Sequence, residues 1–527
     1  MMRGYRFTFS PFAVHAVADF GATTGDDDIR KIHKTFQPVF PGGHPGLSVT
    51  RLPPASRIET ERTMTKRGLI ASWMALFLSI DSCSTDAGDG DEYGDAAIDA
   101  ARAGQGDAGI AEADQKDATG GDAATDAGAI GDAAEGDAVN AETGTRSFYL
   151  AAAPMQYDMG VDHIETVFDV AGFEGLADLV SMHQDFFGVP WEAFAAGDEP
   201  SAGWADSMRS MKESIDAIGA GVYLSITPLN GRRNSIAPRV RTENGETVTE
   251  ENWVEGCVDF GAPLQGIELA KAYSAYARWM VDLFEPVFLT NLIEMNIYDI
   301  KCPERYDSLI GLANQVYDQE KAIDPELPIF PSFTIGTMWG IETIERCQVG
   351  DRTCLQQALE RNAGVKRDRF GISFYPLFLQ WKWTGIPDDF FSAVNEITSE
   401  RIVWAETGWG NRSVTLPYPA PTDPCMTLLE SSDADQIAFL QFLLEDAQRL
   451  NSDLISWWSA RDSLPDHVLT GCPCSSPGLW CVLYDALADA ELLGAWLMWG
   501  AMGVLDYEHR PKASHAIWTD WKARTIE

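Results

Sequence analysis

Short apolar runs that alternate with amphipathic stretches constrain the fold of this chain more than any other feature. Eight runs of five to seven residues recur between residue 147 and the C-terminus, at 148–153, 178–182, 221–226, 287–293, 328–333, 370–374, 401–405 and 453–458. Stretches with helical spacing lie between most of them, for example at 204–218, 264–283, 304–323 and 433–450. Strands that alternate with helices predict a parallel sheet, and eight such units predict a closed α/β barrel, (β/α)8, over 147–527. A doubly wound open sheet is the alternative, but no glycine-rich phosphate loop follows the first run.

Polar and aromatic side chains follow the ends of these runs, where a barrel of this kind gathers its chemistry. Glu294 closes the fourth run and Glu406 closes the seventh, so we expect both carboxylates to face one cleft. The candidate substrate-binding residues at the other run ends are Tyr157, His183, Asp185, Asn230, Asn296, Tyr375, Trp409, Trp457 and Trp458. Successive strand residues face opposite sides, so only one of Trp457 and Trp458 is expected to reach the cleft.

Two carboxylates in an aromatic cleft suit cleavage of a glycosidic bond. One carboxyl donates a proton to the leaving oxygen, while the other attacks or stabilises the cationic sugar carbon. Aromatic faces fit this substrate because the C–H face of a sugar packs on an apolar plane. This chemistry needs no cofactor, and the sequence contains no cofactor motif.

Several short motifs resemble those of the clan A glycoside hydrolases. They are the two glutamates, Glu406-Thr-Gly-Trp409, Gly371-Ile-Ser-Phe-Tyr-Pro376, and a closing region from Gly503 to Ala513 with Trp518 beyond it. Gly371–Pro376 is most similar to the arabinogalactan endo-β-1,4-galactanase family. The resemblance implies a retaining mechanism, with Glu294 as acid/base, Glu406 as nucleophile and Tyr375 as hydrogen-bond partner of the nucleophile.

One position departs from the clan pattern, which has an asparagine immediately before the acid/base glutamate to bind the sugar 2-hydroxyl. Ile293 occupies that position here, and the nearest asparagines are Asn291 and Asn296. Asn296 either takes over this contact or the contact is missing. A non-catalytic glycan-binding or scaffold protein on the same barrel therefore stays open as the alternative.

The segment 84–146 is nearly all Ala, Gly and Asp and contains too little apolar surface to form a core. Like charges along it repel one another, so it is expected to be an extended, disordered linker. Calcium binding is the alternative, but the aspartates lack a fixed spacing with a closing glutamate. The formal charge of the chain is −40, which argues against a nucleic-acid partner.

A basic head and an apolar run precede this linker. Met64-Thr-Lys-Arg67 is followed by an apolar stretch at 69–80 that is short for a transmembrane helix and typical of a signal peptide. Ile80-Asp-Ser-Cys83 resembles a bacterial lipobox, although Asp81 departs from the usual small neutral residue; a buried helix is the other interpretation. We expect 64–83 to be a lipoprotein signal, Met64 to be the initiator, and 1–63 to be an unstructured upstream extension.

Export would place the mature chain in the bacterial cell envelope as a monomer, anchored in the membrane by lipid on Cys83. The remaining cysteines form an even set in an oxidising compartment, which favours disulfides; they are Cys257, Cys302, Cys347, Cys354, Cys425, Cys472, Cys474 and Cys481. Zinc is disfavoured because Cys472-Pro-Cys474 is not a CxxC motif. Cys347–Cys354 is the expected local pair, and the other connectivity stays open.

The lipobox predicts that fatty acid is attached at Cys83. Cells that express the full chain are expected to incorporate labelled palmitate into it, and Cys83→Ala is expected to abolish the label. Labelling that survives the substitution would contradict the prediction. Cys354→Ala, which removes another cysteine, serves as the control and is expected to keep the label.

Overall fold

The structure is a computed structural model that describes residues 5–6, 144–159, 164–184, 187–243, 246–338, 352–376, 390–420, 423–464 and 499–527. The signal segment 64–83, including Cys83, lies outside these ranges, as does nearly all of the linker 84–146. Of the extension 1–63, only β1 (Tyr5–Arg6) is described, and it pairs antiparallel with β5. The three predicted boundaries therefore stay predictions.

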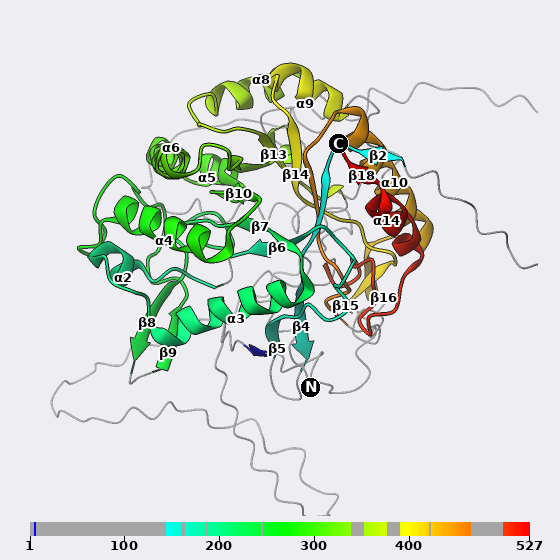
Figure 1. Ribbon diagram of the computed structural model, residues 1–527, viewed down its shortest axis with the longest axis horizontal. Helices are drawn as coiled ribbons and strands as arrows, with labels where there is room; N and C mark the ends of the chain where they lie inside the picture. The colour runs from blue at the N-terminus through cyan, green and yellow to red at the C-terminus, as the bar shows by residue number, and fades with distance from the viewer. Residues whose placement is uncertain are drawn as a thin grey trace, which may run out of the picture. The chain divides into compact units, whose positions relative to one another are not determined.

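A single parallel sheet forms the centre of the fold and confirms the predicted (β/α)8 barrel (Figure 1). Its strands are β3 (Tyr149–Ala152), β6 (Leu179–His183), β7 (Gly221–Ser225), β10 (Phe288–Thr290), β11 (Ile329–Phe330), β12 (Ser332–Thr334), β13 (Phe370–Phe374), β14 (Ile402–Thr407) and β17 (Leu454–Trp457). The hydrogen-bonded order is β11-β10-β7-β6-β3-β17-β14-β13-β12. Each strand therefore lies beside its neighbours in the chain, with β17 beside β3.

The two outer strands of this order are halves of one predicted run. β11 pairs with β10 through Leu289 and Ile329, and β12 pairs with β13 through Ser332 and Gly371. Pro331 separates the halves, and it has no N–H to donate to a neighbouring strand. Because one run supplies both edges, the nine strands amount to the eight predicted units closed into a barrel.

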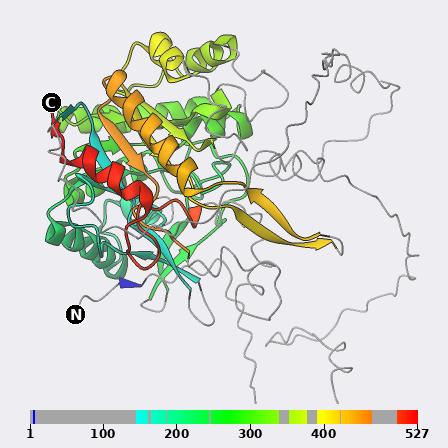
Figure 2. The same cartoon turned by 90° about the vertical axis from the view of Figure 1, so that its right-hand side faces the viewer.

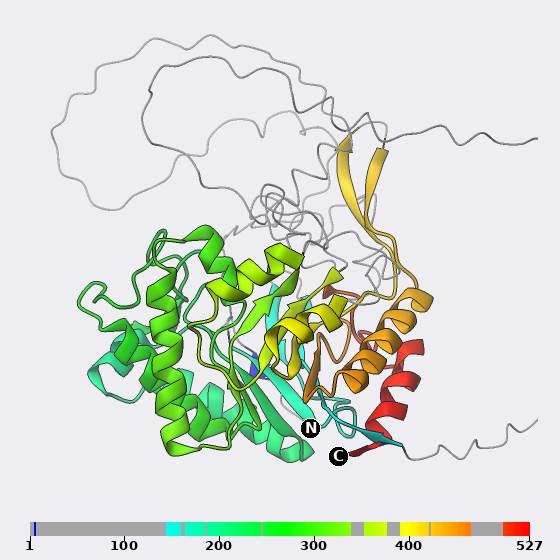
Figure 3. The same cartoon turned by 90° about the horizontal axis from the view of Figure 1, so that it is seen from above.

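Helices surround the barrel, as Figures 1 and 3 show. They are α2 (Trp191–Ala196), α3 (Ala202–Ile218), α4 (Leu269–Phe284), α5 (Met295–Lys301), α6 (Tyr306–Ile323), α7 (Ile335–Met338), α8 (Arg352–Arg361), α9 (Phe390–Thr398), α10 (Asp433–Arg449) and α14 (Ala513–Ala523). The helix predicted at 264–283 begins later, at Leu269. Its first residues instead form a turn, in which Leu264 and Ile267 bridge around Gly266 at φ 85°.

Strand alternation divides the core into two layers. Leu150 and Ala152 of β3 face the helices, while Ala151 between them packs inside the barrel. The barrel interior is completed by residues from six other strands, namely Leu179, Tyr223, Phe288, Phe330, Val403, Ala405 and Leu454. The site residues lie above this layer, at the carboxyl ends of the strands.

Within the residues that the structure describes, three antiparallel hairpins extend the barrel. They are β4 (Met155–Met159) with β5 (Ile164–Phe168), β8 (Arg239–Glu243) with β9 (Glu246–Glu250), and β15 (Val414–Ala420) with β16 (Asp423–Leu429). Figure 2 shows the last of these reaching out from the barrel. The sequence analysis did not predict these hairpins.

The two ends of the barrel domain meet at its amino-terminal face. β2 (Thr145–Arg146) pairs in parallel with β18 (Thr525–Ile526). Arg146 is only 1% exposed, and its guanidinium binds both carboxylate oxygens of Asp178, at 2.9 and 2.7 Å. This ion pair fastens the first residues of the domain to the start of β6.

Two of the expected disulfide cysteines are paired in the structure, and a third is bonded. Cys257 and Cys302 form a disulfide across 45 residues. Cys354 is also disulfide-bonded, but its predicted partner, Cys347, lies outside the described residues. Among the helices that are described, none is long and apolar enough to cross a membrane.

Candidate active site

A β-bulge in β14 turns Glu406 into the barrel mouth. Val403 and Ala405 face the barrel interior and Trp404 faces the helices, so a regular strand would direct Glu406 outward as well. The register with β13 shifts, however, so that Trp404 pairs with Ile372 and Glu406 pairs with Ser373, the next residue. Such a bulge inserts one residue and re-aims the side chain that follows it.

Two side chains fix the Glu406 carboxylate. Nδ1 of His183 lies 3.0 Å from Oε1, and the Tyr375 hydroxyl donates to Oε2 at 2.9 Å. Burial acts to raise the pKa of Glu406, but the charge and hydrogen bond of His183, the charge of Arg233 and the hydrogen bond of Tyr375 together lower it. The geometry therefore favours the ionised form of Glu406.

Glu294 lies across the mouth at the start of α5. It follows β10 in a left-handed conformation, with φ 51°, and its backbone N–H donates to the Ser332 hydroxyl at 2.8 Å. Its carboxylate Oε1 accepts from Ser373 Oγ at 2.7 Å and from Thr334 Oγ1 at 3.2 Å. A non-glycine residue in this backbone conformation is costly and is often associated with a functional constraint.

Ser373 and Arg233 connect the two carboxylates. Ser373 donates to Glu294 and is the strand partner of Glu406. Arg233 Nε lies 3.5 Å from Oε2 of Glu294, and its charge also acts on Glu406. The two glutamates thus lie at the same end of the barrel.

Trp458, and not Trp457, reaches this mouth. Its ring lies edge-to-face with His183, with centroids 5.0 Å apart, and it is 7% exposed. Tyr223 lies below His183 at 6.2 Å. Trp457 points the other way: its indole donates to the Met502 carbonyl at 2.8 Å, and its ring packs near Trp518 of α14.

Three other candidates perform structural roles. Trp409 is 1% exposed and packs on Phe439 of α10, so it does not line the mouth. Asn230 accepts from the backbone N–H groups of Asn234 and Ser235, at 3.1 and 3.2 Å, and so shapes the loop that carries Arg233. Asn296 exchanges hydrogen bonds with the Thr334 backbone, at 3.1 and 2.8 Å.

The two remaining candidates cannot be placed in the site. Tyr157 lies in β4, opposite Thr166 of β5, rather than at the end of β3, and its side chain is outside the described part of the chain. Asp185 also falls outside the described residues. Beyond β17, Arg461 binds Asp169 at 3.3 Å, and Asp462 binds Lys512 at 2.8 Å.

Sequence reasoning missed Arg233 and Ser373. Ser373 lies inside a predicted strand. The only sign that it faces the barrel interior is that it shares a side of the strand with Gly371, two residues before it. Arg233 follows β7 by eight residues, beyond the positions where strand-end residues were sought. Nothing in its local sequence indicates that the loop returns to Glu294.

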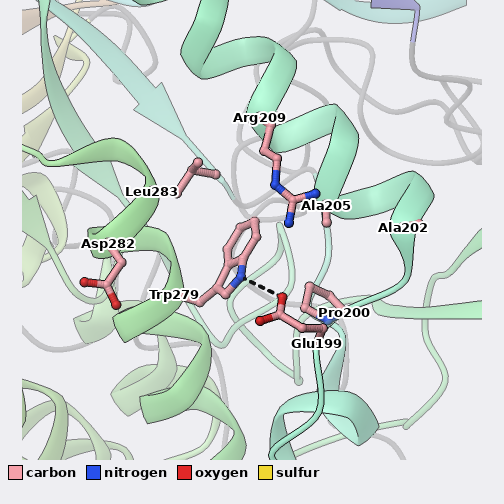
Figure 4. Close-up of a pocket in the computed structure, with 8 residues that line it drawn as sticks. All are labelled: Glu199, Pro200, Ala202, Ala205, Arg209, Trp279, Asp282 and Leu283. Carbon is pink, nitrogen blue, oxygen red and sulfur yellow. Dashed lines mark hydrogen bonds between the residues drawn. The ribbon is translucent and has the colours of Figure 1, made fainter.

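The described residues show neither a metal site nor a well-formed surface groove at this mouth. Within the described ranges, no three His, Cys, Asp or Glu side chains are arranged to bind a metal ion. A groove of about 440 Å³ lies instead between α3 and α4, beside Trp279 and Arg209 (Figure 4). The Trp279 indole there donates to Glu199 at 3.4 Å.

Comparison with known proteins gives matches in structure alone. No family model matches the chain, and no curated protein matches its sequence. Similar solved structures include a fungal β-1,4-galactanase (13% identity, TM-score 0.40, 70% of this chain and 98% of that one) and a β-glucuronidase from Ruminococcus gnavus (12%, 0.36, 72% and 49%). The β-D-glucuronidase of Dictyoglomus thermophilum is also similar (12%, 0.38, 72% and 50%). The likeness is one of fold. This chain spans about half the length of these two glucuronidases.

The close approach of β14 to β17 predicts that Gly408 is intolerant of a side chain. A Cβ at this position would overlap the Trp458 carbonyl oxygen and lie 2.8 Å from Sδ of Met502. Gly408→Ala is therefore expected to lower the free energy of unfolding by about 1–3 kcal/mol. Gly311→Ala is the matched control, since its Cβ meets nothing within 4 Å in α6, and it is expected to stabilise by about 0.5–1 kcal/mol. Urea unfolding of both variants tests this, and equal effects would contradict it.

The lowered pKa of Glu406 predicts a pH-dependent contribution to stability. Because the folded state lowers this pKa below its ordinary 4.5, the unfolded chain binds more protons between the two values. The contribution is therefore complete above pH 4.5 and is lost as the pH falls toward the folded pKa. The Tm of the wild type relative to Glu406→Gln is expected to decrease on acidification below pH 4.5. An increase would contradict the assignment, and the exposed Glu326→Gln is the control.

Proposed function

We propose that this chain is a retaining glycoside hydrolase that cleaves a polysaccharide or oligosaccharide with Glu294 and Glu406. The observation that carries the proposal is the pair of carboxylates at one barrel mouth, connected through Ser373 and Arg233. The environment of Glu406 favours a carboxylate, which is the state a nucleophile needs. The motif resemblance to clan A glycoside hydrolases agrees with these roles.

In the first step, a carboxylate oxygen of Glu406 attacks the anomeric carbon of the bound sugar. The bond from that carbon to the leaving oxygen breaks, and Glu294 gives its proton to the leaving oxygen. Tyr375 and His183 each bind one oxygen of Glu406, so they fix the orientation of the attacking group. The product of this step is a glycosyl ester of Glu406.

In the second step, Glu294 acts as a base. It takes a proton from a water molecule, whose oxygen attacks the anomeric carbon and displaces Glu406. Glu294 is thereby protonated again and Glu406 is again a carboxylate. Two displacements at one carbon return the original configuration. For this mechanism we expect the two carboxyl groups to lie about 5–5.5 Å apart.

Trp458 and His183 supply surfaces that suit a sugar ring. The Trp458 ring stands at the mouth beside His183. Its apolar face fits the C–H face of a sugar, as the proposal requires. The resemblance of Gly371–Pro376 to the galactanase family makes β-1,4-galactan the first polymer to assay.

A non-catalytic glycan-binding protein is the second candidate, and one observation favours it. Ile293 is fully buried, and Asn296 is engaged with the backbone of Thr334. Neither residue therefore presents the amide that clan A enzymes place before the acid/base glutamate. In this case the same mouth would bind a glycan without turnover.

We further propose that the barrel acts at the bacterial cell envelope as a monomer, anchored by lipid on Cys83 and held away from the membrane by the linker 84–146. This part of the proposal rests on the sequence pattern alone. The palmitate experiment with Cys83→Ala tests it independently of any activity.

Substitution of the two glutamates tests their roles. On polysaccharide and aryl glycoside substrates, Glu406→Gln is expected to lose turnover by several orders of magnitude on every substrate, because no covalent ester can form. Glu294→Gln is expected to slow substrates with poor leaving groups by about 10²–10⁴-fold. It should slow the first step of substrates with good leaving groups far less, since these need no proton. Pre-steady-state release of the aryl group measures this step directly.

Rescue by azide distinguishes the acid/base residue from the nucleophile. With Glu294→Ala, azide is expected to attack the glycosyl ester and give a glycosyl azide of retained configuration, whereas Glu406→Ala is expected to give the inverted product. Glu326→Gln should behave as the wild type. Equal losses on all leaving groups in both variants would contradict the roles. Binding of a glycan by the wild type without any turnover would favour the second candidate.

A further inference from the structure

Two hydroxyl groups hold the carboxyl group of Glu294. Ser373 Oγ donates to Oε1 of Glu294 at 2.7 Å, and Thr334 Oγ1 donates to the same oxygen at 3.2 Å. Thr334 and Ser373 are register partners on β12 and β13, so their side chains lie next to each other on one face of the sheet. We call Ser373 and Thr334 the hydroxyl pair.

The hydroxyl pair belongs to a row of residues that crosses three strands. Ser373 is in the middle of this row: it pairs with Thr334 on one side and, because of the bulge in β14, with Glu406 on the other. The row therefore contains the proposed nucleophile and both hydroxyl donors to the proposed acid. Through Ser373, the place of Glu294 relative to Glu406 depends on the register of β12, β13 and β14.

The backbone around Glu294 is anchored to β12 as well. The Ser332 hydroxyl accepts from the backbone N–H of Glu294 at 2.8 Å. The Asn296 side chain, two residues beyond Glu294, exchanges hydrogen bonds with the backbone of Thr334 at 3.1 and 2.8 Å. Ser332 and Asn296 are both buried. These contacts fix the backbone of Glu294 against β12, and the hydroxyl pair fixes the carboxyl end of its side chain.

Hydroxyl donors suit a carboxyl group that changes its protonation state. A serine or threonine hydroxyl can donate to a carboxylate and also to the carbonyl oxygen of a protonated carboxyl group. The proposed mechanism takes Glu294 through both states, as an acid in the first step and as a base in the second. The same two hydrogen bonds can therefore persist through the whole cycle, and Glu294 need not be reoriented between the steps.

From this geometry we infer that Ser373 and Thr334 are positioning residues of the reaction, which orient the carboxyl group of Glu294 toward the leaving oxygen. They act through Glu294 and need not touch the substrate. Asn296 acts one contact further away, since it holds the backbone of Thr334. Orientation matters because a displacement of about 1 Å can lower the rate of a reaction about 10²-fold. The inference rests on the proposed function, because it concerns the acid of that mechanism.

Removal of both hydroxyls tests the inference through the choice of leaving group. Ser373→Ala/Thr334→Val removes the two donors and keeps the shape of the threonine. Single-turnover release of the aryl group from aryl glycosides measures the first step. A poor leaving group needs the proton of Glu294, so its release is expected to be about 10- to 100-fold slower than with the wild type. A good leaving group needs no proton, so its release is expected to be nearly unchanged. A purely structural role would slow both.

A conservative variant and a matched control complete the experiment. Ser373→Ala/Thr334→Ser restores one hydroxyl, and it is expected to recover part of the rate that the first double variant loses on poor leaving groups. Ser456→Ala removes a different buried hydroxyl of the barrel, which donates to Ser181 at 2.9 Å. It is expected to leave the dependence on the leaving group as in the wild type.

The possible failures are distinguishable. Hydrolysis by the wild type, with both leaving groups slowed equally or neither slowed by Ser373→Ala/Thr334→Val, would overturn the inference and leave the proposed function standing. The same holds if Ser456→Ala reproduces the effect of the double variant. Absence of any turnover by the wild type would overturn the proposed function, and this inference with it.

Discussion

The bulge in β14 is the feature on which the candidate site depends. A regular strand would bury Glu406 against the helices, as it buries Trp404, and would leave an unpaired charge in the apolar layer. The shifted register directs Glu406 to His183 and Tyr375 instead, which offer a ring nitrogen and a hydroxyl. Two residues later, Gly408 allows β14 to approach the backbone of β17. The position of one carboxylate is thus decided by backbone geometry before any side chain interacts with it.

Arg233 acts on both glutamates of the candidate site. Its Nε lies 3.5 Å from Oε2 of Glu294, the residue that donates the proton in the proposed mechanism, and its charge lowers the pKa of Glu406. One loop residue therefore contributes to the electrostatics of both carboxylates, although it lies on neither of their strands.

The sequence predicted the barrel well because its signals are local. Run length, strand alternation and helical spacing determine the eight units, and the position of Glu294 and Glu406 at strand ends follows from them. Nothing in the sequence indicated the bulge in β14. Trp409 was therefore expected at the mouth from its position after the strand, but it packs on Phe439. Arg233 was missed because its place depends on the path of a loop, which the hydrogen bonds of Asn230 define. Contacts between residues far apart in the chain decide these details, and no short window contains them.

The pairing of β2 with β18 determines the point at which the chain enters the barrel domain. Both strands lie at the amino-terminal face of the barrel, where Arg146 binds Asp178, whereas Glu406 and Glu294 lie at the carboxyl ends of the strands. The chain therefore enters the barrel at Gly144, at the pole opposite the two glutamates. A force applied at Gly144 would act first on the short β2–β18 ladder and the Arg146 ion pair rather than on the two glutamates.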